Sequence, residues 1–430
     1  MKNERQQPAI RTPEHIDVPA AAMSAAPNGV KIYTLDCSDQ DVIRFSFVFR
    51  AGSSLQDAPF SASATANMLS EGSTLRPAQE IAEALDFHGS YYDVALDRDY
   101  AVINFVSLLK HFERTLEIAR EIVLMPAFDE RELATYCAKH KQRLAVERSR
   151  PSFRVRELFT SALFGAEHPY GVSYPEERYD DLRREHLAEF YRRHYTAADC
   201  FVVCSGKVAP EHTQMIAQLA AGLPEGTPYT APEFRATESE RFVFSPYPDA
   251  VQSSIRTGRL LFPRTHPDFV TMQVLSTVLG GYFGSRLVRN LREEHGYTYG
   301  AFSSVVNLEY SGYLAIATEV AAEVTQDAVA QIFAEITRLH TEPVPDEELQ
   351  MVKKIMAGEV MRILDGPFGI ADVTIENIQN GTDNTYLDRW LEEVRAMTPE
   401  RLLSAAQRYL DPDGFTTVIV GNPALEEVFK

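Results

Sequence analysis

The chain has 430 residues, a length that suits two or more domains with cores of their own. Its composition, 45% apolar and 24% charged residues, is typical of a globular protein. A formal net charge of −19 argues against nucleic acid or an anionic membrane surface as the main partner.

Hydrophobic periodicity predicts strands, helices, a hairpin, further helices and a closing strand in the first half of the chain. In order, these are strands at 31–35 and 43–50, helices at 61–70 and 79–87, a hairpin at 91–96 and 101–107, three or four helices that include 112–124 and 129–148, and a strand at 201–205. The second half predicts the same sequence of elements. They are a strand at 253–261, helices at 268–279 and 285–294, a hairpin within 299–320, helices at 328–339 and 346–363, and a strand at 415–420.

Two similar pairs of segments indicate that the chain is an internal duplication. Tyr195 and Tyr409 lie 214 residues apart, and each precedes a short turn and an apolar strand that ends at glycine. Leu133 and Leu349 lie 216 residues apart, on helices that follow a proline and begin with acidic residues. Two matches at nearly one offset, in the same order, favour duplication over chance.

The duplication predicts two homologous domains, 1–223 and 241–430, joined by the Pro/Gly/Thr-rich linker 224–240. Runs of strands that alternate with runs of helices indicate an α+β fold, in which each domain has a mostly antiparallel sheet packed with helices.

The cysteines are too few and too scattered for a disulfide framework or a cysteine-rich zinc site. They are Cys37, Cys137, Cys200 and Cys204. Cys200 and Cys204 share one face of an apolar strand, so we expect buried free thiols. The N-terminal twenty residues lack an apolar signal-peptide core, and no stretch of eighteen apolar residues occurs. We therefore expect a soluble, cytoplasmic protein.

Segment 47–74, FVFRAGSSLQDAPFSASATANMLSEGST, resembles the start of M16 peptidases, the pitrilysin/insulinase family of inverted-motif zinc peptidases. There a strand ends in Ala-Gly-Ser, and the next helix carries His-x-x-Glu-His followed by Met-Leu and Gly-Thr. Residues 51–53, 68–69 and 72 match that frame. HPYG at 168–171 and LGGYFGSRLVRNLREEHGYTYG at 279–300 extend the resemblance over nearly the whole chain. The long glycine-rich loop of the mitochondrial processing peptidase's non-catalytic subunit is absent, so the chain looks like a bacterial, M16B-like member.

The resemblance places unsuitable residues at the family's metal-binding positions. Counting back from Met68, the two histidines fall on Ser63 and Asn67, and the catalytic glutamate falls on Ala66. Imidazoles at i and i+4 can hold one zinc ion, and the glutamate moves a proton of the bound water. Serine, asparagine and alanine are poor replacements for these functions.

The family's third ligand is a glutamate, and its position falls on Arg143, or on Glu147 one helical turn later if the register slips. A guanidinium there would repel a metal ion. His186 and His194 alone hint at ligand spacing, but their arginine-rich surroundings favour the solvated face of a helix. We therefore expect no metal or other cofactor in this chain, and zinc in a partner.

In active members of the family, an arginine and a tyrosine seven residues later come from the second half and complete the site. Arg292 and Tyr299 match this pair. A tyrosine hydroxyl can donate to an oxyanion, and an arginine can anchor the substrate backbone. Alternatively, Arg292 caps its helix and Tyr299 merely begins a strand. The spacing within the family frame favours the functional interpretation.

Three functions remain open. The leading hypothesis is a non-catalytic, site-completing subunit of a heterodimeric zinc peptidase that acts on peptides or unfolded segments, paired with a zinc-bearing homologue. The second is a proteolytically inactive scaffold or peptide-binding protein with the same fold. The third, an active peptidase with an unrecognised site, conflicts with the degenerate helix. A homodimer would leave two clefts without metal, so we expect the chain to be inactive alone.

Overall fold

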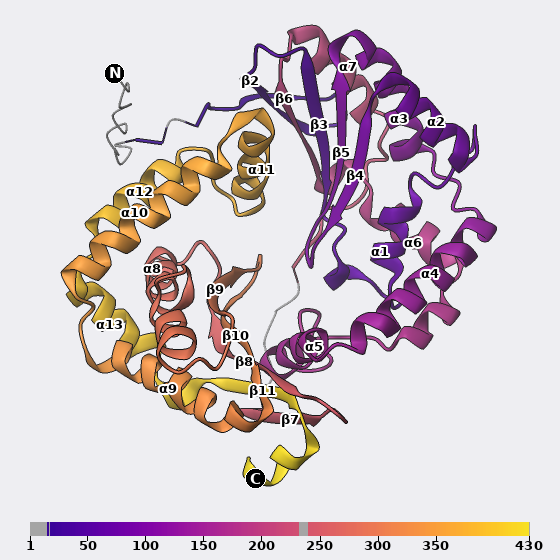
Figure 1. The fold of residues 1–430 in the computed structure, drawn as a ribbon. Coiled ribbons are helices and arrows are strands. Elements are labelled where there is room, and N and C mark those ends of the chain that lie inside the picture. Colours follow the sequence, from indigo (N-terminus) through magenta and orange to yellow (C-terminus); the bar gives the residue numbers. More distant parts are fainter. Residues whose placement is uncertain (1–14, 17, 232–239, 430) are drawn as a thin grey trace, which may run out of the picture.

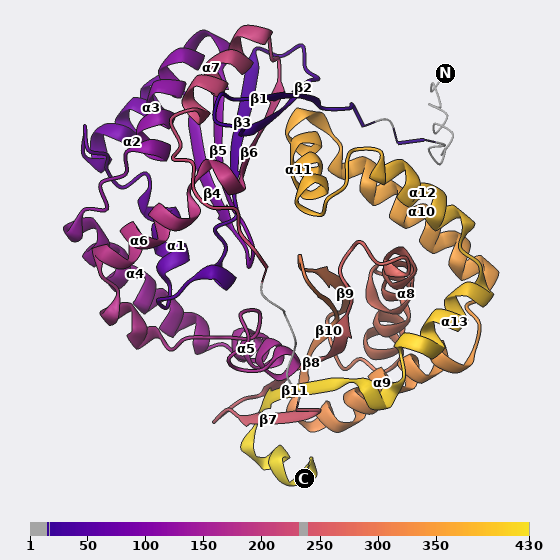
Figure 2. The same ribbon diagram turned by 180° about the vertical axis from the view of Figure 1, so that it is seen from behind.

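The computed structural model describes residues 15–16, 18–231 and 240–429. These residues form two α+β halves that face each other, with their sheets toward the centre and most of their helices outside (Figures 1 and 2). Residues 232–239 of the expected linker lie outside the described residues, and the domain boundaries stay a prediction.

The first sheet has the strand order β1-β2-β6-β3-β5-β4. Its strands are β1 (Ala22–Ala25), β2 (Lys31–Asp36), β3 (Val42–Phe49), β4 (Tyr91–Leu96), β5 (Ala101–Leu108) and β6 (Cys200–Gly206). All neighbouring strands are antiparallel except β2 and β6. All residues of β3 from Phe45 to Phe49 are fully buried, and the ring of Phe45 stacks on Phe105 of β5 with centroids 5.0 Å apart.

The second sheet, β7-β11-β8-β10-β9, repeats this order without the first strand. Its strands are β7 (Phe242–Pro246), β8 (Gln252–Leu261), β9 (Ala301–Asn307), β10 (Gly312–Ala321) and β11 (Thr416–Gly421). Again one pair, β7 with β11, is parallel and the others are antiparallel. The duplicated α+β fold expected from the sequence is therefore confirmed.

Helices follow the strands in the same order in both halves. In the first half they are α1 (Ser61–Met68), α2 (Ala78–His88), α3 (Phe112–Leu124), α4 (Glu130–Arg148), α5 (Pro151–Phe164), α6 (Arg184–His194) and α7 (Pro210–Ala220). In the second half they are α8 (Phe269–Gly280), α9 (Thr325–Thr341), α10 (Asp346–Ile363), α11 (Gly366–Gln379), α12 (Tyr386–Ala396) and α13 (Pro399–Tyr409).

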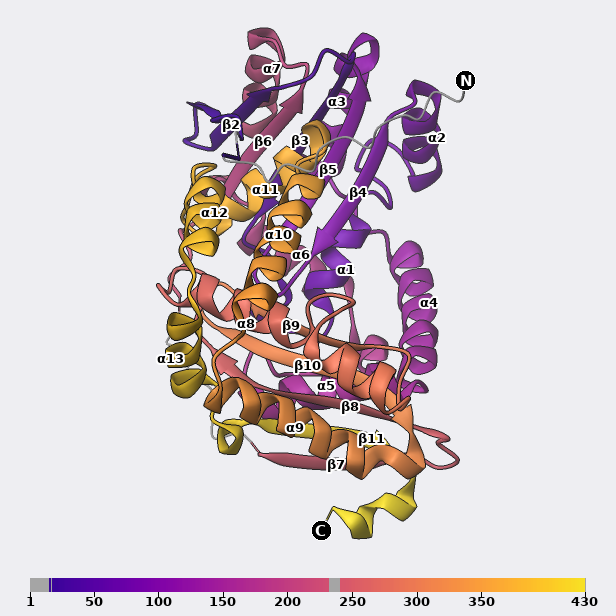
Figure 3. The ribbon, with the colours of Figure 1, turned by 60° about the vertical axis from the view of Figure 1, so that its left-hand side comes forward.

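The two halves exchange one helix each. Helix α5 of the first half packs on the second sheet, where the buried Phe159 joins Ala315, Val418 and Val420 in one apolar cluster. Helix α11 of the second half packs on the first sheet, where Ala371 joins a cluster with β-strand residues of that sheet. Figure 3 shows both crossings. This exchange fixes how the halves face each other and what lies between them.

Most elements agree with the sequence within two residues at their ends, but the segment 285–294 differs. It is a π-helix, η5 (Val288–Glu294), rather than an α-helix over its full length. The four cysteines are free, and Cys200 and Cys204 are buried, as expected. Within the described part of the chain, no helix has the length and apolar character needed to cross a membrane.

Candidate functional site

Helix α1, which carries the degenerate metal positions, follows a tight approach between two turns. After β3 the chain passes so close to the β4–β5 turn that a Cβ on Gly52 would lie 2.3 Å from the carbonyl oxygen of Arg98. Only glycine fits such an approach. Phe60 then takes a left-handed conformation, with φ of 65°, and α1 begins at the next residue. Residues 51–53 therefore hold α1 against the hairpin.

The side chains at the two histidine positions are bound to their own helix. Ser63 Oγ donates to the carbonyl oxygen of Phe60 at 3.0 Å, and Asn67 Nδ2 donates to the carbonyl oxygen of Ser63 at 2.7 Å. Ala66, at the position of the family's general base, is fully buried and has no group that moves a proton. This face of α1 therefore offers neither an imidazole nor a carboxylate.

The third-ligand position points into solvent. The side chain of Arg143 is 68% exposed and pairs with Glu147, one turn along α4, at 3.2 Å. His186 accepts a hydrogen bond from the backbone N–H of Arg183 at 3.1 Å, and His194 packs against a phenylalanine of its own helix. Among the residues that the structure describes, no three histidine, cysteine or acidic side chains are placed to hold a metal ion.

An aromatic cluster fills the space between α1 and α4 where the family's metal would lie. Tyr136 stacks on His140 with ring centroids 4.0 Å apart, and the ring of Tyr179 lies 6.5 Å from that of Tyr136. Burial raises the pKa of Tyr136 above its usual range, an effect that the nearby Ser63 and Asn67 oppose. Burial raises the pKa of Tyr179 to about 12.

Burial and then the charges of Arg143 and Lys139 lower the pKa of His140, so its imidazole is neutral at pH 7. The residues present do not fit zinc. The sequence analysis missed this cluster; its signal is the i, i+4 pair of Tyr136 and His140, one turn before the third-ligand position.

Arg292 and Tyr299 lie in the second half, near the start of β9. The guanidinium of Arg292 lies 4.6 Å from the ring centroid of Phe283. In the described structure Arg292 makes no hydrogen bond to the end of its own helix, which Gly296 closes with φ of 68°. Tyr299 is 92% exposed. The structure therefore does not show the capping role for Arg292, and it leaves the Tyr299 hydroxyl open to another molecule.

Two cavities lie beside α5. One, of about 420 Å³, is bordered by Ser63 and by Phe153 and Arg156 of α5. The other, of about 650 Å³, is bordered by Tyr299 and by residues 152 and 155 of the same helix. The two sets of lining residues have no member in common, so Ser63 of the degenerate metal helix and Tyr299 border separate cavities within this chain.

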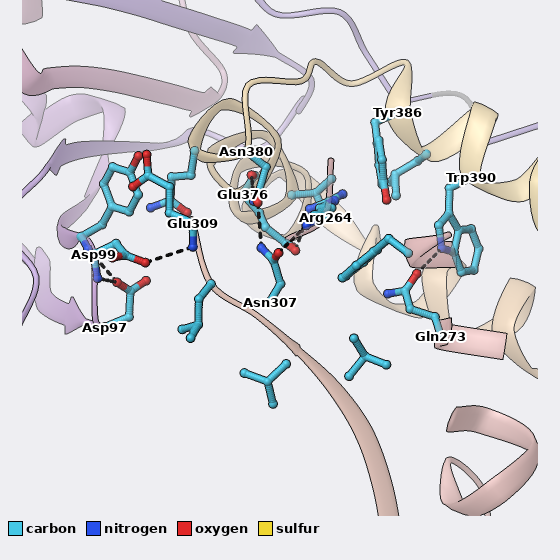
Figure 4. A pocket seen from close by; sticks show the side chains of 18 of the residues that line it. Asp97, Asp99, Arg264, Gln273, Asn307, Glu309, Glu376, Asn380, Tyr386 and Trp390 are labelled. Atoms are coloured by element: carbon cyan, nitrogen blue, oxygen red, sulfur yellow. Dashed lines mark hydrogen bonds and ion pairs between the residues drawn. The ribbon is translucent and has the colours of Figure 1, made fainter. Parts of the chain in front are cut away.

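A third cavity, of about 570 Å³, lies where the β4–β5 and β9–β10 turns meet (Figure 4). Its polar groups bind one another. Asp99 accepts the backbone N–H of Glu309 at 3.2 Å and the hydroxyl of Tyr170 at 2.7 Å, while Arg264 pairs with Glu376 at 2.7 Å. The contact between Asp99 and Glu309 joins the two halves.

The HPYG segment at 168–171 lies at the same junction. Tyr170 is 1% exposed and shares an apolar cluster with Ala315 and Val418 of the second half. A Cβ on Gly171 would lie 2.2 Å from the carbonyl oxygen of Gly165. The turn is therefore part of the core between the halves.

Two family models match the chain in sequence order. The family described as "Insulinase (Peptidase family M16)" matches residues 61–175, and the "Peptidase M16 inactive domain" matches residues 181–356. The chain belongs to peptidase family M16.

Curated M16 relatives cover most of the chain. It is 23% identical over 354 residues to the "Uncharacterized zinc protease YmxG" of Bacillus subtilis, an alignment that covers 81% of this chain and 85% of that protein. It is 22% identical over 339 residues to an "Uncharacterized zinc protease" of Rickettsia felis, an alignment that covers 77% of this chain and 81% of that protein. A shorter match, 20% over 161 residues and 37% of each chain, is to the "Probable inactive metalloprotease YmfF" of Bacillus subtilis.

Solved structures share the fold over nearly the whole chain. The "peptidase M16 inactive domain" from Pseudomonas fluorescens superposes with a TM-score of 0.86 at 22% identity, and covers 94% of this chain and 98% of that one. A protease from Helicobacter pylori superposes with a TM-score of 0.82 at 16% identity, and the superposition covers 94% of this chain and 99% of that one. The M16 frame found in the sequence is thus confirmed.

Proposed function

We propose that this chain is the non-catalytic subunit of a two-chain M16 peptidase and completes the active site of a zinc-bearing homologue. The observation that carries the proposal is the exposure of Tyr299. The family positions this tyrosine to act on a substrate at a metal site, yet here it is 92% exposed, and the chain's own degenerate metal helix borders a different cavity. A site that this tyrosine serves would therefore belong to another chain.

The surroundings of Tyr299 support an interaction with another molecule. Phe302, which borders the same cavity, is 68% exposed, and Phe283 under Arg292 is 66% exposed. Large exposed aromatic side chains that gather on one surface commonly mark a binding site. Because the chain carries a net charge of −19, we expect its partner to present a basic face.

Each residue of the pair has a distinct expected role. The Tyr299 hydroxyl would donate a hydrogen bond to the substrate's carbonyl oxygen as that oxygen gains negative charge. Arg292 would bind backbone carbonyl groups of the substrate and hold the peptide in register. The partner would supply the metal chemistry. Peptides and unfolded segments are the substrates that such an enclosed site admits.

Assembly tests the proposal. We expect the full-length chain to co-purify from its native cells with a homologue that contains His-x-x-Glu-His, and to bury roughly 1,200–2,000 Å² or more with it. A mixture of the two purified chains should form a one-to-one complex in sedimentation, and only the mixture should cleave a peptide. Self-association alone, with no homologue bound at low or high salt, would instead favour a peptide-binding scaffold.

A further inference from the structure

Three arginines between the two halves form no ion pair with the residues that the structure describes. They are Arg98 in the β4–β5 turn, Arg156 on α5 and Arg256 on β8. In the described structure none of them donates a side-chain hydrogen bond or forms an ion pair, although Arg156 lies 5.0 Å from the ring centroid of Phe153. This is unexpected in a chain with 61 acidic and 42 basic residues, where a carboxylate is seldom far from an arginine.

Two of the three guanidinium groups border one cavity, and Arg256 borders the neighbouring cavity of about 650 Å³. Arg98 and Arg156 border the 420 Å³ cavity next to Ser63, together with Tyr313 of β10. Burial raises the pKa of the Tyr313 hydroxyl, and the charges of Arg256, Arg98 and Arg156 all oppose that rise. All three arginines therefore act on this single hydroxyl, and Arg98 and Arg156, which border the cavity, give it a positive potential. We call it the arginine pocket.

The acidic groups nearest the arginine pocket are already engaged. Asp99 accepts the Tyr170 hydroxyl at 2.7 Å, and Glu157 accepts Arg148 at 2.9 Å. Burial lowers the pKa of Arg98, and the charge of the neighbouring Asp99 offsets that effect only in part. A partly buried guanidinium that forms no ion pair is costly, and an anionic ligand would reduce that cost.

The walls of the pocket indicate what carries the anion. Besides the arginines, it is bordered by aromatic and aliphatic side chains, among them Phe60, Leu144 and Tyr174. A volume of about 420 Å³ exceeds what a small inorganic anion needs and falls in the range of organic ligand sites. We propose that the arginine pocket binds the C-terminal carboxylate of a peptide, with the last side chain against the aromatic wall.

This inference deepens the proposed function by naming the end of the peptide that the chain holds. It depends on the proposed function in one respect, namely that peptides enter the space between the halves. It needs no partner subunit, because the pocket is formed by one chain. Guanidinium groups recognise carboxylates through paired, charge-assisted hydrogen bonds, so both charge and geometry should matter.

Binding to the isolated full-length chain tests the inference. The probes are two fluorescein-labelled octapeptides of one sequence that ends in phenylalanine, one with a free C-terminal carboxylate and one with a C-terminal amide. Fluorescence anisotropy should show that the free acid binds at least about tenfold tighter, the usual size of one charge-assisted hydrogen bond or more. Arg98→Met and Arg156→Met should each remove most of this preference.

Arg192→Met is the matched control, because it removes the same charge from α6, where Arg192 is 71% exposed and pairs with Glu189. It should leave the preference intact. Arg156 is exposed, so Arg156→Met should fold even if Arg98→Met does not.

Several results would overturn the inference. Equal affinity for the free acid and the amide would overturn the inference, although peptides could still enter between the halves. A loss of the preference for the free acid in Arg192→Met as large as in the pocket variants would also overturn it. Competition by millimolar inorganic phosphate without any peptide binding would show a small-anion site instead. No binding of either peptide would also overturn it, and the pairing experiment would still decide the proposed function separately.

Discussion

Truncation of Phe159 tests whether the exchanged helix α5 holds the two halves together. Phe159 is fully buried, and its ring lies edge-on to that of Tyr313 with centroids 6.1 Å apart. The backbone of β8 packs closely against Phe159, because a Cβ on Gly258 would lie 2.9 Å from Phe159 Cζ and 1.9 Å from the carbonyl oxygen of Leu314. A cavity left here cannot close easily, so Phe159→Ala should lower the free energy of unfolding by about 3–5 kcal/mol.

Urea unfolding followed by circular dichroism and by tryptophan fluorescence measures this change. The single tryptophan, Trp390, lies on α12 of the second half, so its signal reports that half. Phe87→Ala, the same chemical change at an 84% exposed side chain on α2, should cost no more than about 0.5 kcal/mol. A loss below about 1 kcal/mol for Phe159→Ala would refute the packing of α5 on the second sheet.

Two further predictions concern metal and pH. The purified chain should contain far less than one zinc per chain by elemental analysis, because Ser63 and Asn67 donate to backbone carbonyl groups; about one tightly held zinc per chain would end this account. Burial lowers the pKa of His194 to about 4, below its ordinary value of 6.5, so the folded chain disfavours the protonated imidazole. The contribution of His194 to the free energy of unfolding should therefore be present above pH 6.5 and be lost as pH falls toward 4. His194→Gln should make the urea midpoint depend less on pH in this range. An unchanged pH dependence in the variant would contradict this prediction.

Periodicity and duplication were enough to predict the architecture. The offsets at Tyr195 and Tyr409 predicted two like halves, because a repeated sequence repeats its sheet order. The exchange of α5 and α11 could not be predicted, since an amphipathic helix shows that it has an apolar face but not which sheet covers that face. The π-helix at Val288–Glu294 was also missed, because its extra residue per turn leaves no distinct pattern in ten residues.

The departures at Ser63, Ala66 and Asn67 from the family's metal motif could be recognised in the sequence, because zinc sites demand particular residue types at fixed spacing. The aromatic cluster beside these positions could not be predicted in the same way. Tyr136 and His140 are ordinary helix residues in the sequence, and only their meeting with Tyr179 shows that they fill the space. Likewise, nothing in the sequence sets Arg98 apart from the other arginines until its lack of an ion pair with the described residues is seen.

The central claim is that Tyr299 serves a second chain, and Tyr299→Phe in the reconstituted complex tests it most directly. The substitution removes one hydroxyl from a side chain that is 92% exposed, so folding and pairing should be unchanged. Peptide cleavage by the complex should fall by roughly a hundredfold or more, mainly in kcat, because the hydrogen bond strengthens as charge develops on the substrate. Arg292→Ala, made in parallel, should also raise KM. Undiminished turnover by a fully assembled Tyr299→Phe complex would contradict the claim and make this chain a scaffold.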